Sequence, residues 1–542
     1  MQTKFFTTLI LLVSVSWSLT AQTSLRVNQI LQENCASCHG GMSPAASLDL
    51  SGDAFAMIAS LVNVTPTNAH AANEGYDLIY PGRADKSYLF RLVQDGLESF
   101  IEMDAAEMPA TPHNDEALGL TSVEKELIRQ WISYGAGYYG TAVEESLLED
   151  YYTNGGMESF PNGRPAAPDP SEGFQIKMGP FFLAPGSEGE VEYFQKYELD
   201  NDQPIEIIRI DNFMDGNSSH HFIMYDYNST ASAANQQAGF RLNPDHYNVG
   251  LVEAIQDPVD LILPEGSAFF WSADKVLDLN SHYINYHSVP YKSEVYANIY
   301  YQESGAAAQE MHAELVTNFI CIPNNGDPYS VQDVVTDNSV GDIYVWALSG
   351  HTHQLGKGYK IWQRENGVAT ELLYDASCWE GEPGCVSPYY DYRHIPFRYF
   401  DDFVSLDMSS GNGFVHEATW VNDTDNVVCW GDTSEDEMMV MILMFLTDID
   451  GVVTDVENPE AEIDILNAYP NPMTESAIIE LPEDSGAVDL ILYDVLGNQI
   501  RAIRDIRDNQ ITIERGHLSA GMYVYHLENE AGKLFSGKIL MQ

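Results

Sequence analysis

The chain has 542 residues, more than one hydrophobic core holds, so several domains are expected. It carries 25 Lys and Arg against 81 Asp and Glu, a formal net charge of −56. This negative charge disfavours nucleic acids and anionic membranes as partners, because both would be repelled. The 44% of hydrophobic residues is typical of a folded protein.

The N-terminus has the pattern of a secretory signal peptide over residues 1–21. Lys4 precedes an apolar stretch from Phe5 to Val15, and small residues follow up to Ala21. No later stretch has the roughly 18 uninterrupted apolar residues that a transmembrane helix needs. We therefore expect an exported protein, secreted or attached to the cell surface, in which disulfides are permitted.

The motif CASCH at residues 35–39 is a CxxCH pattern. In this pattern the thiols of Cys35 and Cys38 bind a haem c covalently, and His39 ligates its iron. The alternative is a redox dithiol beside a histidine.

Three further segments resemble the small cytochrome c domains that are fused to exported bacterial enzymes: LDLS at 48–51, YPGRADKSYL at 80–89 and EMP at 107–109. The resemblance implies an α-helical cytochrome c domain over residues 22–139, with Met108 as the distal iron ligand and Met103 as its rival. Thr121 and Glu124 predict a capping box at the start of the closing helix. The Gly- and Pro-rich residues 140–170 are expected to form an interdomain linker.

Short β-rich runs separated by turns follow, which predicts an antiparallel sandwich or jelly roll over residues 171–310. This region contains NSSHHF at 217–222 and HYINYH at 282–287. Adjacent side chains on a strand point to opposite faces. If His220 and His221 bind one metal, the backbone must therefore bulge there.

A second β-rich region is expected over residues 311–450. It contains an apolar run, then SGHTHQLG at 349–356, and later DEMM at 436–439. Residues i and i+2 of a strand share a face, so His351 and His353 could bind one metal. The alternative is an exposed strand end with two histidines. Residues 365–367, ENG, predict a hairpin turn.

The four cysteines of this region allow three disulfide pairings. We favour a short loop closed by Cys378 and Cys385, which leaves Cys321 and Cys429 for a long-range bridge. The isolated His416 has no motif around it, and we expect it at the surface.

In their order along the chain, the histidine and methionine motifs resemble those of the copper type II monooxygenases, the family of peptidylglycine α-hydroxylating monooxygenase and dopamine β-monooxygenase. The resemblance covers roughly residues 172–450 and implies two jelly-roll-like copper domains. It implies an electron-transfer copper on His220, His221 and His282. It also implies an oxygen-binding copper on His351, His353 and Met438, where a soft thioether would favour Cu(I).

The implied activity is O2-dependent hydroxylation of a substrate C–H bond by a copper monooxygenase. The haem would then admit electrons, with ascorbate as a possible external reductant. The alternative is a non-catalytic surface redox or copper-binding protein. Three positions that hold the substrate carboxylate in the peptide-amidating enzyme are Ser349, Val440 and Ile442 here, which favours a neutral or apolar small substrate. Met439 replaces a cysteine of the family, so the disulfides must differ.

The last part, residues 451–542, is expected to be a linker and a small β-sandwich. Its segments YPNP at 469–472, LYDVLGNQI at 492–500 and LSAGMYVYHL at 518–527 resemble the sorting domain of type IX secretion substrates. The resemblance implies the outer-membrane secretion machinery as a partner. A carbohydrate- or partner-binding module is the alternative.

Overall fold

The computed structural model divides into two compact units, residues 1–452 and 453–542. Strands hold 45% of the residues and helices 15%, which confirms the prediction of a mainly β protein. No helix in the described part of the chain is long and apolar enough to cross a membrane. The structure describes residues 22–94, 97, 120–161, 163–186, 191–199, 201, 203–215, 218–243, 249–256, 260–378, 384–387, 390–393, 396–431, 435–453, 464–466, 468–474, 476–481, 488–493, 499–507, 510–515, 518, 521–529 and 534–541.

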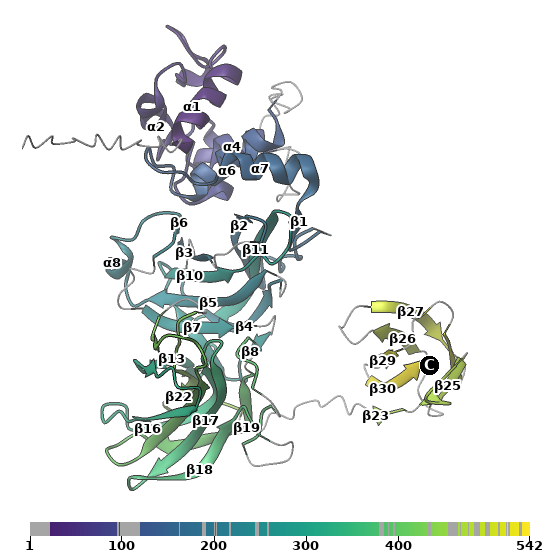
Figure 1. The fold of residues 1–542 in the computed structure, drawn as a ribbon. Helices are drawn as coiled ribbons and strands as arrows, with labels where there is room; N and C mark the ends of the chain where they lie inside the picture. The colour runs from purple at the N-terminus through teal and green to yellow at the C-terminus, as the bar shows by residue number, and fades with distance from the viewer. Residues whose placement is uncertain are drawn as a thin grey trace, which may run out of the picture. The chain divides into compact units, whose positions relative to one another are not determined.

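The N-terminal part of the first unit is helical (Figure 1). The predicted capping box is present: the Thr121 hydroxyl accepts from the Glu124 amide at 3.2 Å, and the Glu124 carboxylate accepts from the Thr121 amide at 3.0 Å. The helices are α1 (Thr23–Asn34), α2 (Ala54–Leu61), α3 (Ala69–Asn73), α4 (Tyr88–Val93), α6 (Ser122–Ser133) and α7 (Glu145–Asp150), with short turns η1 (Ala45–Ser47), η2 (Ala84–Lys86) and η3 (Tyr151–Gly155).

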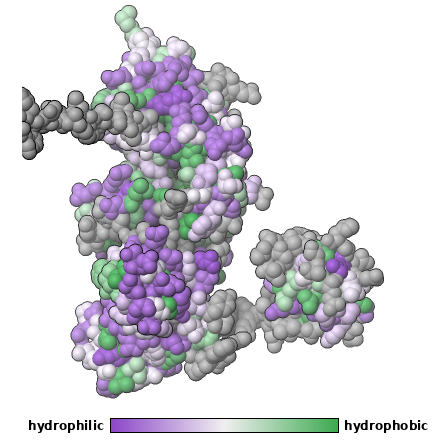
Figure 2. Space-filling view, in the orientation of Figure 1, coloured by the Kyte–Doolittle hydropathy of each residue, from purple (hydrophilic) through white to green (hydrophobic). Residues whose placement is uncertain are grey.

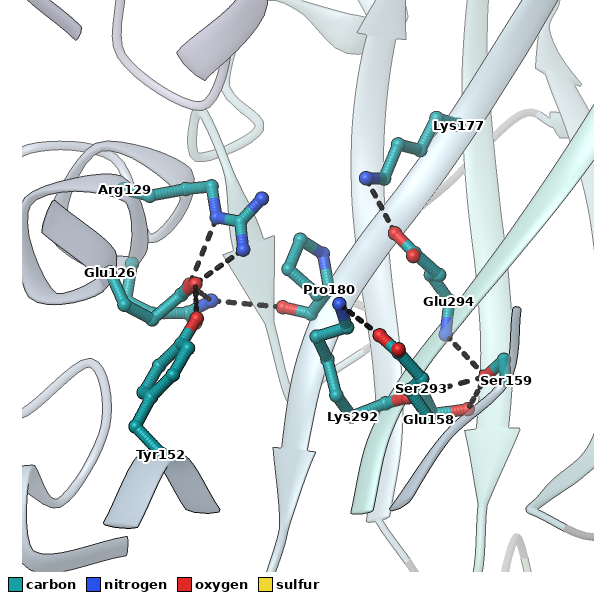
Figure 3. A network of polar contacts seen from close by, with 11 residues as sticks. Glu126, Arg129, Tyr152, Glu158, Ser159, Lys177, Pro180, Lys292, Ser293 and Glu294 are labelled. Atoms are coloured by element: carbon teal, nitrogen blue, oxygen red, sulfur yellow. Dashed lines mark hydrogen bonds and ion pairs between the residues drawn. The ribbon is translucent and has the colours of Figure 1, made fainter. Parts of the chain in front are cut away.

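The helical part packs directly against the β-strands that follow it. Phe182 lies in the helical core, whereas Tyr134 packs against the core of the first β-region. The side chain of Gln130 donates to the Pro180 carbonyl at 3.0 Å. Figure 3 shows the buried Glu126 beside this contact, where its carboxylate accepts from Arg129 Nε at 2.9 Å and from the Tyr152 hydroxyl at 3.1 Å.

The segment 140–170, predicted as a linker, contains α7, η3 and the strand β1 (Met157–Glu158), which pairs in parallel with a strand of the first β-region. Tyr151 contacts Phe182 edge-on with ring centroids 5.2 Å apart. These aromatic contacts hold the segment against the fold, and its Gly and Pro content alone did not reveal them.

The first β-region pairs a seven-stranded sheet with part of a nine-stranded sheet around one large core. The seven-stranded sheet contains β1, β2 (Gly173–Leu183), β4 (Ile205–Phe213), β8 (Leu261–Ile262), β9 (Ser267–Trp271), β11 (Tyr291–Glu303) and β12 (Gln309–Glu310). A short helix α8 (Thr230–Ala233) lies in one connection.

The nine-stranded sheet continues across the domain boundary expected near residue 310. In order, it contains β19 (Arg398–Asp407), β16 (Asp342–His351), β22 (Val440–Leu446), β13 (His312–Thr317), β7 (Val249–Ile255), β5 (Ser219–Tyr227), β10 (Val276–Tyr283), β3 (Val191–Glu198) and β6 (Phe240–Arg241). Both histidine motifs therefore lie on strands of one sheet.

The second β-region places a four-stranded sheet against the β16–β22 part of the long sheet. Its strands are β15 (Pro328–Val335), β20 (Gly413–Val421), β17 (Gly356–Glu365) and β18 (Val368–Asp375), and a separate pair joins β14 (Cys321–Ile322) to β21 (Val428–Cys429). The predicted hairpin turn joins β17 to β18, where Asn366 and Gly367 have positive φ.

Strand β22 explains the methionine-rich run. Val440, Ile442 and Met444 face the first core, whereas Met441 and Leu443 face the second. A strand that is buried on both faces needs apolar side chains at every position rather than at alternate ones.

The two disulfides of the second β-region are Cys321–Cys429 and Cys378–Cys385. The favoured pairing is thus confirmed. The first bridge joins the short strands β14 and β21 directly, because its two cysteines are partners in their register.

The second unit, taken by itself, is a small β-sandwich around its own core. A five-stranded sheet holds β23 (Asp464–Ile465), β30 (Leu534–Met541), β29 (Gly521–Asn529), β26 (Val488–Tyr493) and β27 (Gln499–Ile506), and a three-stranded sheet holds β24 (Ala468–Tyr469), β25 (Ser476–Glu480) and β28 (Gln510–Glu514).

Figure 2 shows mainly hydrophilic residues on the visible face of the helical and large β-regions, with hydrophobic residues in small separate groups. This surface agrees with the large excess of acidic residues.

Glu253 on β7 is a buried carboxyl group in the first core. It is 3% exposed, and only its Oε1 has a hydrogen bond, from Asn212 Nδ2 at 2.9 Å. Burial raises the pKa of Glu253 to about 8, although the bond from Asn212 opposes this. The folded protein therefore retains a proton that the unfolded chain loses above its ordinary pKa of 4.5.

The free energy of unfolding of Glu253→Gln is expected to increase relative to that of the natural protein as the pH rises from 5 to 8. Over this range, each pH unit lowers the free energy of unfolding of the natural protein by about 1.4 kcal/mol through Glu253, and glutamine has no such loss. Denaturant unfolding at both pH values measures the difference, with the exposed Glu310→Gln as the control. An equal difference at pH 5 and pH 8 would contradict the burial argument.

Candidate metal centres

The first candidate centre lies where β5 and β10 pair. His221 and His282 are direct cross-strand partners, with ring centroids 5.1 Å apart. The next register pair joins Tyr283 to Ser219, so His220 is the extra residue of a β-bulge. The backbone thus has the irregularity that two adjacent histidine ligands require. The side chain of His220 lies outside the described part of the structure.

A carboxylate and an amide support this histidine pair. Glu192 on β3 is the cross-strand partner of His282, and its Oε1 lies 3.4 Å from His221 Nε2. Asn280 Oδ1 lies 3.1 Å from the same nitrogen, and Asn280 Nδ2 donates to Glu192 Oε1 at 2.9 Å. Burial tends to raise the pKa of Glu192, but the hydrogen bond and charge of His221 hold it below its usual value.

Such contacts fix the orientation of a metal-binding imidazole. Nε2 of His221 faces Glu192 and Asn280, which hold the ring in one orientation. Sequence reasoning missed Glu192 and Asn280. Asn280 could have been found, because it lies two residues before His282 and so on the same face of the strand. Glu192 follows only from the pairing of β3 with β10.

The second candidate centre lies at the end of β16, where His351 is the last residue of the strand. Its ring centroid is 5.2 Å from that of His353. His351 pairs with Val440 of β22, which is the last pair of this register, and Met438 precedes Val440 by two residues. Met438 is partly buried and packs at the edge of the first core. The fold therefore brings His351 and His353 together and places the segment that carries Met438 next to them.

Glu437 holds the loop that carries His353. This fully buried carboxylate accepts hydrogen bonds from the amides of His353 at 2.9 Å and Leu355 at 2.6 Å, and from Trp420 Nε1 at 2.9 Å. Burial raises the pKa of Glu437 to about 7, and these hydrogen bonds limit the increase. The sequence shows Glu437 beside Met438, but only the structure shows that it connects three separate segments.

The ring nitrogens of the second centre also have defined partners. His353 Nδ1 lies 3.2 Å from the Asp436 carbonyl, and this contact orients the imidazole. His351 Nδ1 lies 3.3 Å from Gln256 Nε2. Gln256 is a third residue that the sequence did not identify.

Among the described side chains, no three His, Cys, Asp or Glu residues gather closely enough to hold a metal ion. The proposed donor sets are consistent with this finding. The first set needs His220, whose side chain is not described, and the second uses a thioether as its third donor. Imidazole and thioether are ligands that suit copper.

The CxxCH motif follows directly on α1. Cys35 and Cys38 are not joined in a disulfide, and His39 Nδ1 lies 3.0 Å from the Ala45 carbonyl. A backbone carbonyl on Nδ1 orients an imidazole whose Nε2 ligates a metal, so the three residues fit a haem c. Met108, the proposed distal ligand, lies outside the described residues, as does Met103.

Three positions beside the second centre were predicted to offer no charged partner to a substrate. Ser349, Val440 and Ile442 are uncharged and are all buried in the strands beside the second centre.

The prediction that His416 lies at the surface was wrong. His416 is fully buried and contacts the Tyr359 hydroxyl at 2.6 Å through Nδ1. Burial lowers its pKa to about 4. Cross-strand packing on β20, which the isolated residue did not reveal, places it there.

Comparison with known proteins identifies the C-terminal part. Residues 467–542 match the family model of the secretion system C-terminal sorting domain. The protein is therefore an exported protein, cell-surface or secreted, that interacts with the type IX secretion machinery. No copper monooxygenase or cytochrome c family model matches, and no curated protein sequence matches the chain.

Three solved structures illustrate the likeness of this chain to known folds, which is weak in each case. Ruminococcus gnavus β-glucuronidase has 10% identity and a TM-score of 0.13, over 40% of this chain and 35% of that one. The CBM51-2 and INT domains of Clostridium perfringens ZmpB have 10% identity and a TM-score of 0.11, over 41% and 74% of the two chains. The BSP domain of a biofilm-associated protein has 9% identity and a TM-score of 0.12, over 69% and 85%.

Proposed function

We propose that this exported protein is a copper- and haem-containing monooxygenase that hydroxylates a C–H bond of a small substrate with O2. The observation that carries the proposal is the pairing of His351 and His353 at the end of β16, next to the segment that carries Met438 and on the same sheet as the His221–His282 pair. His351, His353 and Met438 would hold one copper ion and His220, His221 and His282 the other, and the two ions would supply one-electron redox chemistry and the activation of O2.

The chain's own residues have separate tasks in this proposal. Glu437 fixes the loop of His353, so that the ligand does not have to be ordered when metal binds. Glu192 and Asn280 orient His221. The buried, uncharged Ser349, Val440 and Ile442 favour a neutral or apolar substrate over a peptide carboxylate.

The test is incubation of the copper-loaded, reduced protein with a panel of chemically diverse small substrates under ¹⁸O-labelled O2. We expect about two copper ions per chain and one labelled oxygen in a hydroxylated product. No labelled product, together with reversible oxidation and reduction of bound copper, would support the alternative of a non-catalytic surface redox protein.

The proposed haem gives the helical part a role as the electron donor. This part packs directly on the first β-region through Tyr134, whose ring centroid is 6.3 Å from that of Tyr193 next to Glu192. The helical part is held by direct side-chain packing and not only by the chain connection. This packing favours electron transfer from the haem toward the His221–His282 pair.

Replacing Cys35 and Cys38 together by Ala is expected to remove the covalent haem and its absorbance, because both thioether bonds are lost. In rapid mixing with a reductant, copper reduction should then be at least about tenfold slower than in the natural protein. Cys38→Ser alone, which leaves one thiol, is the control for incomplete attachment. Equal copper reduction rates with and without haem would exclude the helical part as the electron donor.

A further inference from the structure

A small polar cavity lies on one face of β11. Alternate residues of this strand, such as Val295 and Ala297, lie in the first core, so the residues between them lie on the opposite face of the sheet. The cavity has a volume of about 190 Å³, less than the roughly 300 Å³ at which pockets for drug-sized ligands begin. Its lining includes Glu158, Phe160, Arg164, Lys292, Glu294 and Tyr296.

The two carboxylates of the lining are both paired with lysines. Lys292 Nζ lies 2.5 Å from Glu158 Oε2, and these two residues are register partners in β11 and β1. Lys177 Nζ of β2 lies 2.5 Å from Glu294 Oε2. Figure 3 shows both ion pairs side by side. The four charges cancel, so neither carboxylate gives the cavity a net negative charge.

Arg164 supplies the remaining charge of the cavity. Its half-buried side chain has no hydrogen bond or ion pair with any residue that the structure describes. The chain has 81 acidic residues against 25 basic ones, so a carboxylate partner would be easy to supply. The cavity therefore has about one net positive charge, and its guanidinium can donate to a ligand. These features fit an anion with a single charge.

The shape of the donor and the opposite wall define the anion further. A guanidinium presents a planar fork of N–H donors that matches both oxygens of a carboxylate. A phosphate monoester has a charge of about −1.5 to −2 at pH 7, which one arginine beside two paired carboxylates balances poorly. Phe160 and Tyr296 meet edge-on with ring centroids 5.2 Å apart and offer an apolar surface. A small carboxylic acid with an apolar group satisfies both features.

We propose that this cavity binds a small monocarboxylate, with the carboxylate on Arg164 and the apolar group against Phe160 and Tyr296. None of the proposed copper or haem ligands lines the cavity, so the site is separate from the candidate centres and does not depend on the proposed copper function. Leu97, which follows α4, also lines it. A bound carboxylate would therefore contact both the helical part and the first β-region.

The test measures the binding of benzoate to the full chain by isothermal titration calorimetry. Benzoate has one carboxylate on an aromatic ring, and benzamide is a neutral probe of the same shape. We expect benzoate to bind with a millimolar or lower Kd, at least about tenfold more tightly than benzamide, because a charged hydrogen-bond pair is lost in the amide. Inorganic phosphate should bind more weakly than benzoate.

Variants of the lining assign the site. Arg164→Gln should weaken benzoate binding at least about tenfold and leave benzamide binding unchanged, whereas Arg164→Lys, which keeps the charge but not the fork, should lie between. Arg393→Gln is the control, because Arg393 is an exposed arginine outside the cavity that pairs with Asp391. Glu158→Gln should tighten benzoate binding severalfold, because it removes a negative charge from the lining.

The opposite signs of these effects separate charge recognition from damage to the cavity, since a merely disrupted cavity would bind benzoate more weakly in every variant. Equal affinity of the natural protein and Arg164→Gln for benzoate would overturn the proposal. So would the absence of benzoate binding at millimolar concentrations, tighter binding of phosphate than of benzoate, or weaker binding in Glu158→Gln.

Discussion

Met438→Leu is expected to lower O2-dependent hydroxylation by at least about a hundredfold while the copper of the His221–His282 pair is retained. Leucine keeps the size and apolar character of the side chain, so the packing of Met438 against the first core changes little. It removes the thioether that we propose as the third ligand beside His351 and His353. Copper content should fall toward one ion per chain in metal analysis, and labelled product should disappear.

The matched control is Met439→Leu at the next residue. Met439 is fully buried in the second core, where its sulfur lies 3.9 Å from Asn318 Nδ2, so it faces away from the histidines. This variant should keep both copper ions and full activity. If Met439→Leu lost the second copper and Met438→Leu did not, the assignment of the thioether ligand would be wrong.

Glu437→Ala is expected to destabilise the second β-region by about 3 kcal/mol or more. The change leaves the amides of His353 and Leu355 and the indole of Trp420 as buried donors without a partner, and each such donor costs about 1–3 kcal/mol. Equilibrium denaturant unfolding measures the loss.

Two further variants test whether the loss of stability comes from the hydrogen bonds that Glu437 accepts. Glu435→Ala, two residues earlier and exposed, should change stability by less than about 0.5 kcal/mol. Glu437→Gln keeps one acceptor oxygen and should lie between these two results. Equal stability of Glu437→Ala and Glu435→Ala would show that the three hydrogen bonds do not hold the loop.

The local signals in the sequence predicted much of the fold. The capping box at Thr121, the hairpin turn at Asn366–Gly367 and both disulfides are present as expected. These features depend on residues that are close in sequence or, for the cysteines, on a small number of combinations. The sheet that continues past residue 310 was not predictable, because it depends on which distant strands pair.

The same division applies to the candidate centres. The sequence supplied the ligand types and their order, and it showed that a bulge is needed at His220 if both adjacent histidines bind one metal. It did not supply Glu192, Gln256 or Glu437, because their roles depend on strand register and on contacts between segments up to 95 residues apart.

The sequence by itself therefore determined an exported, acidic, mainly β protein with a C-terminal sorting domain, since composition and local motifs carry that information. Only the tertiary structure decided that the helical part is packed on the first β-region and that the segment carrying Met438 runs next to the end of β16. Both facts follow from the pairing of β22 with β16 and the burial of Tyr134 and Phe182, which no local pattern encodes.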